Sequence, residues 1–99
     1  MMGTIIKEVA TKFLLSEEEV VTEGLKAFLH RQLQTYESER QHLFAKHSVN
    51  DFDDLDAYVA AHPNQETNLL PDLQRADYLT KQVNDVRKLL AELNDARIA

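Results

Sequence analysis

The sequence contains no cysteine and no tryptophan, and only two glycines and two prolines among 99 residues. Without cysteine the chain can form no disulfide, no thiolate metal site and no thiol nucleophile. The low glycine count also excludes a glycine-rich phosphate-binding loop. Residues that interrupt helices are scarce, whereas Ala, Leu, Glu, Gln and Lys are plentiful. The composition therefore predicts an all-α protein.

Long hydrophobic runs are also missing. No stretch reaches the roughly 18 apolar residues that a membrane-spanning helix needs. Lys7 and Glu8 interrupt the early apolar segment in which a signal peptide would have its core. We therefore expect a cytoplasmic protein. The net charge is −6, and residues 51–99 carry ten acidic against five basic side chains. This imbalance disfavours nucleic acid and membranes and favours a basic protein partner.

The clearest positive signal is an apolar stripe in the last third of the chain. Its members recur in steps of three and four residues, which places them on one side of a helix predicted over residues 71–97. They are Ala76, Leu79, Val83, Val86, Leu90 and Leu93. A stripe this long and narrow is typical of a coiled-coil seam, so the helix needs a partner.

A second long helix is predicted over residues 16–47. Ser16 and Glu19 have the spacing of a capping box, and no proline interrupts the residues that follow. The seam of this helix consists of Leu25, Leu29, Leu33 and Tyr36. A short helix over residues 51–61 separates the two long ones. We therefore expect a single domain, built as a long antiparallel helical hairpin with a short connecting helix.

The hairpin alone would leave much of each stripe in water. We therefore expect two chains to pair as a homodimer and form a four-helix bundle, or one hairpin to dock on another protein.

Residues 1–15 are predicted to be an extended arm or strand. Ile5, Val9 and Phe13 lie on one side of a two-residue alternation, with Lys7 and Thr11 between them. A single strand needs a partner. We therefore expect the three apolar residues either to contact a partner protein or to stabilise the homodimer.

A basic strand followed by a capped helix also resembles the opening of ribbon-helix-helix repressors, whose paired strands enter the major groove of DNA. Those proteins turn after a short helix, whereas this helix is predicted to continue to about residue 47. A DNA-binding transcriptional regulator that uses the N-terminal strand in a dimer is therefore the alternative function.

The candidate chemical groups do not form a catalytic or metal-binding pattern. An EF-hand loop beginning at Asp51 would need glycine and glutamate where Asp56 and His62 stand. The four histidines lack the i, i+4 spacing of paired zinc ligands. We therefore expect neither an enzyme nor a metal or cofactor site. The acidic residues instead suit charge matching with a basic protein such as a toxin: Asp53, Asp54 and Asp56.

Four segments in order resemble small prokaryotic helical proteins that are proposed to act as antitoxins and are usually encoded beside a toxin. The segments are FLLSEEE at residues 13–19, GLKAFL at 24–29, FDDL at 52–55 and DYL at 77–79. The resemblance implies a protein that binds and neutralises a partner, without catalytic residues. The predicted function is accordingly a non-catalytic protein–protein interaction module of the antitoxin type.

Overall fold

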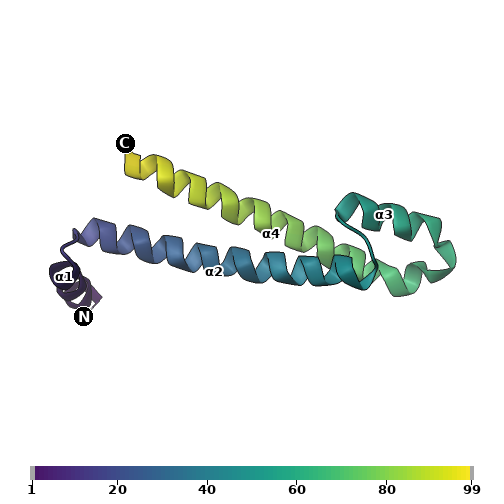
Figure 1. Ribbon diagram of the computed structural model, residues 1–99, viewed down its shortest axis with the longest axis horizontal. Helices are drawn as coiled ribbons and strands as arrows, with labels where there is room; N and C mark the ends of the chain where they lie inside the picture. Colours follow the sequence, from purple (N-terminus) through teal and green to yellow (C-terminus); the bar gives the residue numbers. More distant parts are fainter. Residues whose placement is uncertain (1, 99) are drawn as a thin grey trace.

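The computed structural model describes residues 2–98, which form helices and the short connections between them. Helix α1 covers Met2–Phe13, α2 Glu17–Lys46, α3 Phe52–Ala61 and α4 Glu66–Ile98, and a short 3-10 helix, η1, covers Pro63–Gln65. Helices α2 and α4 run antiparallel as the two arms of a hairpin (Figure 1). The all-α prediction is therefore confirmed for the described residues.

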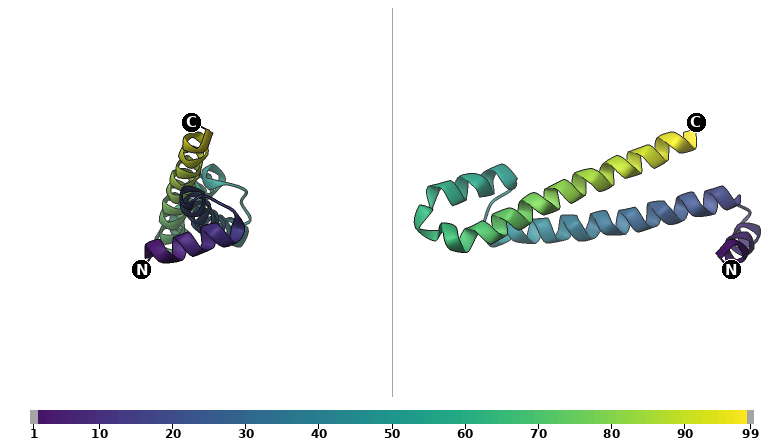
Figure 2. Two further views of the ribbon diagram at one scale, coloured as in Figure 1. Left: turned by 90° about the vertical axis from the view of Figure 1, so that its left-hand side faces the viewer. Right: turned by 180° about the vertical axis from the view of Figure 1, so that it is seen from behind.

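The hairpin has two unlike ends. Helices α2 and α4 lie close together where α3 folds back on them, and they diverge toward the start of α2 and the end of α4 (Figures 1 and 2). We call residues 33–82, which include α3 and η1, the closed end. The open end comprises residues 2–32, which include α1 and the first half of α2, together with residues 83–95 of α4. Helix α1 lies crosswise at the start of α2 (Figure 2).

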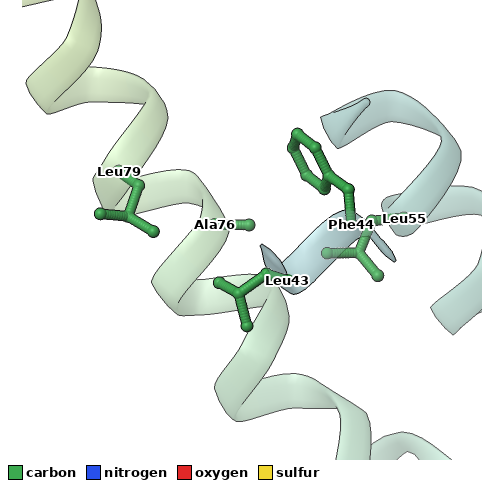
Figure 3. Packing of buried hydrophobic residues seen from close by; sticks show 5 residues of the cluster. All are labelled: Leu43, Phe44, Leu55, Ala76 and Leu79. Carbon is green, nitrogen blue, oxygen red and sulfur yellow. The ribbon is translucent and has the colours of Figure 1, made fainter. Parts of the chain in front are cut away.

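The core lies at the closed end, where three helices meet. Leu43 and Phe44 of α2, Leu55 of α3, and Ala76 and Leu79 of α4 form one buried cluster (Figure 3). Leu55, Ala76 and Leu79 are completely inaccessible to solvent. Burial of one such leucine side chain stabilises the fold by about 1.5–3 kcal/mol, which explains why α3 folds back over the two long helices.

The ends of α2 follow from local sequence. The Ser16 hydroxyl accepts a hydrogen bond of 3.0 Å from the Glu19 amide, and the Glu19 carboxylate accepts one of 3.2 Å from the Ser16 amide. The predicted capping box is therefore confirmed. At the other end, the Val49 amide donates to the Phe44 carbonyl over 2.9 Å. This Schellman turn places Ser48 at a φ of 55°, in the left-handed region.

The N-terminal segment is a helix, so the prediction of an extended arm or strand is wrong for residues 2–13; residue 1 lies outside the described residues. Ile5, Val9 and Phe13 are four residues apart, which suits one face of a helix as well as one face of a strand. The segment forms a helix because a helical backbone is hydrogen-bonded internally, whereas the described chain offers no strand for pairing. The resemblance to ribbon-helix-helix repressors required a strand in this segment, and residues 2–13 form a helix instead.

Helix α4 begins at Glu66, five residues before the predicted start at Pro71. Residues 65–68 have the polar composition of a loop, but η1 leads directly into α4 and Leu69 is buried in its second turn. Pro71 costs the helix one hydrogen bond to the carbonyl of Thr67. The helix nevertheless continues through this proline, because the φ angle of proline is compatible with helical backbone.

Candidate protein-interaction surface

An apolar cleft opens between the two arms of the hairpin at the open end. It has a volume of about 370 Å³ and is lined by Leu25, Phe28, Leu29, Leu89, Glu92 and Leu93. Phe28 is 57% exposed, and Leu25 and Leu89 are each 47% exposed. Large apolar side chains that gather in this way on a protein surface are typical of an interface with another protein.

The cleft stays open because no third helix of the described residues covers the arms there (Figure 1). Val86 and Leu90 of α4 are buried, but the matching part of α2 keeps Val21, Leu25 and Phe28 exposed. At the closed end, α3 packs against α4 and helps to bury the corresponding residues. The apolar stripes of the two arms are therefore satisfied over only part of their length.

Helix α1 adds apolar surface beside the start of α2. Ala10 is buried, Ile6 and Val9 are half-buried, and Ile5 and Phe13 are mostly exposed. At the corner between α1 and α2, Leu14 is 92% exposed and has a φ of 58°, in the left-handed region. Of the predicted contact residues, Ile5 and Phe13 are thus accessible, while Val9 is partly covered.

The predicted acidic contacts lie at the other end of the molecule. Asp53, Asp54 and Asp56 are exposed on α3. Asp51 caps that helix, because its carboxylate accepts a hydrogen bond of 2.8 Å from the Asp54 amide. The molecule is 62 Å long, with α1 near one end and α3 near the other (Figure 1). The structure therefore does not bring the apolar and the acidic contact residues together.

The predicted seam residues differ in burial along the hairpin. Buried residues of α4 are Leu79, Val83, Val86 and Leu90. Half-buried ones are Leu29, Leu33, Tyr36 and Leu93, while Leu25 is exposed. Every residue of the seam that is less than buried thus lies on α2 or near the free end of α4. In the single chain, α4 is better covered than α2.

Polar contacts that sequence reasoning missed tie the arms together at the closed end. The Asp72 carboxylate accepts a hydrogen bond of 2.9 Å from Lys46 Nζ and lies 2.8 Å from His47 Nε2. The hydrogen bond from Lys46 is the larger cause and the one with His47 the next, and together they hold the pKa of Asp72 below its ordinary value. The partners are 25 or more residues apart in sequence, so no local pattern could have revealed the pairing.

A second ion pair lies closer to the middle of the hairpin. Arg75 donates two hydrogen bonds to Glu39, one of them 2.9 Å long from Nη2 to Oε1. This bidentate contact lowers the pKa of Glu39. Arg87 and Glu37 form a further ion pair between the arms. The contacts fix the register of α2 against α4, and none of them lies in the apolar cleft.

Among the described residues, no three His, Asp or Glu side chains lie close enough together to hold a metal ion. Within the same residues, no helix combines the length and the apolar character needed to cross a membrane.

The fold and surface define a class of protein: an elongated helical hairpin with an apolar cleft at its open end. The chain belongs to the uncharacterized protein MJ0235 family, whose model matches residues 1–98. It is 27% identical to the uncharacterized protein MJ0235 of Methanocaldococcus jannaschii over 77 residues, which cover 78% of this chain and 94% of that relative. No solved structure matches the chain.

Proposed function

We propose that this protein is a non-catalytic protein–protein interaction module. It pairs with a second copy through the open end, which completes a four-helix bundle, and the pair binds a basic protein in the manner of the antitoxin-like proteins that its segments resemble. The apolar cleft carries this proposal. In the described part of the chain, Glu92 is the one ionisable side chain among those that line it, so the cleft suits apolar packing better than acid–base chemistry.

The amount of exposed surface supports pairing. The chain exposes 7310 Å², whereas a compact monomer of the same mass exposes about 5,800 Å². If pairing buries this excess of about 1,500 Å² on each chain, the dimer interface buries about 3,000 Å² in total. That total lies in the range of obligate homodimers. The radius of gyration is 19.5 Å, against about 13 Å for a compact domain of 99 residues.

The sign of the charge supports a basic partner. The net charge is −6, and the exposed acidic residues of α3 lie away from the apolar cleft. They would therefore stay accessible after the open end has paired. Opposite charge on the partner would speed the encounter and disfavour acidic competitors. The DNA-binding alternative has lost its support, because the segment that it required as a strand is helix α1.

Light scattering after size-exclusion chromatography tests both the homodimer and the binding of a partner protein. The protein alone is expected to have the mass of a dimer at micromolar concentration, and a monomer would contradict the pairing. Co-expression with the product of the neighbouring gene is expected to yield a stable mixed complex. A homodimer that forms no mixed complex would contradict the antitoxin-like role and leave the pairing intact.

Charge variants test whether the acidic residues of α3 bind the partner protein. Replacing Asp53, Asp54 and Asp56 with Asn should weaken the mixed complex and reduce its sensitivity to salt. The matched control replaces three exposed acids outside α3, Glu8, Asp85 and Asp95, with their amides, and should have a smaller effect. Equal effects of the two sets would show that net charge matters and that the surface of α3 does not.

A further inference from the structure

Exposed apolar side chains are distributed unevenly along the hairpin. The open end carries most of the large ones: Met2, Ile5, Phe13, Leu14, Leu15, Val21, Leu25, Phe28 and Leu89. The closed end carries Leu70 and Tyr78. An interface that buries apolar surface therefore gains far more from covering the open end than from covering the closed end.

Acidic side chains are also distributed unevenly, but they are concentrated at the closed end. Residues 47–71 of the closed end contain five acidic side chains and no lysine or arginine. Two closed ends placed side by side would bring ten carboxylates together without a basic residue from this segment. Such repulsion raises the free energy of a dimer in which the two hairpins point the same way.

The apolar surface ends near the middle of the hairpin. There the hollow between the arms is lined by Gln34, Glu37, Ser38, Arg40, Gln41 and Arg87. The ion pair between Arg87 and Glu37 lies in this region. A second chain that extended over the polar middle would have to cover these groups, which costs free energy unless each finds a new partner. The middle of the hairpin therefore marks the limit of a favourable overlap.

From these distributions we infer that two copies pair open end to open end, antiparallel, and overlap only over their open ends. The inference rests on the proposed homodimer and adds its orientation and extent. Phe28 and Leu25 of each chain enter the cleft of the other, as twofold symmetry requires. The two α3 helices lie at opposite outer ends of the dimer, where their acidic residues remain accessible to a partner.

The first experiment locates the interface. Phe28→Asp places a charge in the apolar cleft, and the dimer dissociation constant should rise by at least about 30-fold, as for an interface hot spot. The matched control is Leu70→Asp, which alters an exposed leucine at the closed end and should leave the mass dimeric. Circular dichroism checks that both variants are helical, and Leu25→Lys replaces Phe28→Asp if that variant does not fold. A folded Phe28→Asp protein whose dimer dissociation constant equals that of the wild type would overturn the inference.

The second experiment determines the orientation, and the absence of cysteine makes it direct. Single cysteines replace Asp56 on α3 and Ala27 on α2, both exposed, and carry spin labels. Labels at position 27 should lie within about 30 Å of each other, because packed helix axes are only 8–10 Å apart. Labels at position 56 should be separated by more than the 62 Å length of one chain.

Excess unlabelled protein should abolish the short distance at position 27, because that distance joins two chains. A short distance at position 56 in a dimer would overturn the inferred orientation while leaving the homodimer in place. A monomeric wild-type protein would instead overturn the proposed pairing. The two failures are therefore distinguishable.

Discussion

The closed and open ends of the hairpin are built from the same two helices but reach different degrees of burial. At the closed end, α3 covers the arms and a cluster of five residues is buried. At the open end, the arms diverge and leucines of the same kind remain about half exposed. A regular apolar stripe therefore does not by itself produce a core. At the open end Val83, Val86 and Leu90 of α4 are buried, but Leu25 and Phe28 of α2 stay exposed. There the described chain adds only the crosswise helix α1 (Figure 2).

The polar contacts reinforce this difference. The Asp72 and Glu39 carboxylates each bind basic side chains across the closed half of the hairpin. The Arg87–Glu37 pair lies near the middle of the hairpin, and the cleft at the open end is lined by apolar side chains and Glu92. We therefore expect the closed end to be the stable unit of the single chain and the open end to depend on its partner.

The largest expected effect comes from truncating leucines at the two ends. Leu79→Ala leaves a cavity in the closed-end cluster and should lower the free energy of unfolding by about 2–5 kcal/mol. Leu89→Ala removes a half-exposed side chain of the cleft and should cost the folded monomer less than about 1 kcal/mol. Urea denaturation at low protein concentration measures both.

At high protein concentration, the cost of Leu89→Ala should increase, because the side chain would then be buried between two chains. The cost of Leu79→Ala should not change with concentration. Equal costs for the two variants under all conditions would contradict the difference between the ends.

The next effect concerns the pH dependence of the closed end. The pKa of Asp72 in the folded chain lies below its ordinary value of 3.8. The folded state therefore binds a proton less readily than the unfolded state. The resulting stabilisation is fully present above pH 3.8 and is lost as the pH falls through the lower, folded pKa.

Asp72→Asn should lower the free energy of unfolding by about 1–2 kcal/mol at neutral pH, because it weakens two charge-assisted hydrogen bonds. Below the folded pKa of Asp72, the variant and the wild type should converge. Acid titration followed by circular dichroism gives both curves. Glu39→Gln is the control, and its effect should be smaller because that pair is more exposed.

Helix caps give a smaller effect that also distinguishes the two ends. Ser16→Ala removes the cap of α2 at the open end, and Asp51→Ala removes the cap of α3 at the closed end. Each should cost about 1 kcal/mol. For Ser16→Ala, hydrogen exchange should accelerate most at the Glu19 amide, which loses its acceptor. An unchanged exchange rate at Glu19 would contradict the capping role of Ser16.

Much of this fold could be predicted from residues close together in sequence. The steps of three and four residues in α4 and the Ser16–Glu19 spacing depend on local geometry, and both features are present. The spacing of Ile5, Val9 and Phe13 was misleading because intervals of four suit a helix and a strand equally. Only the absence of a pairing strand among the described residues decides between them, and that is a property of the fold.

The candidate surface was less predictable for a related reason. Leu25 and Leu79 are both predicted seam residues, yet Leu79 is fully buried and Leu25 is about half exposed. Their burial depends on where α3 folds back and where the arms diverge. The pairing of Asp72 with Lys46 and His47 depends in the same way on the register of the hairpin. No pattern within a single segment of the sequence indicates the burial of these leucines or the pairing of Asp72.

The smallest expected effect comes from the two residues with left-handed backbone, one at each end. Leu14 and Ser48 both occupy the position in a Schellman turn that glycine prefers, with φ angles of 58° and 55°. The left-handed conformation costs a non-glycine residue about 1–2 kcal/mol, and glycine returns part of this through the greater freedom of the unfolded chain. Ser48→Gly should therefore raise the free energy of unfolding by about 0.5 kcal/mol.

Ala45→Gly is the matched control for Ser48→Gly, because it lies in the last turn of α2 with helical backbone and should be destabilising by about 1 kcal/mol. Leu14→Gly should relieve the same strain at the open end, but it also removes a side chain that is 92% exposed in the single chain. If the second copy covers the corner between α1 and α2, Leu14→Gly should stabilise the monomer and weaken the dimer. Thermal unfolding at two protein concentrations separates the two effects. An equal gain from Leu14→Gly at both concentrations would place this corner outside the dimer interface and confine the contact to α2 and α4.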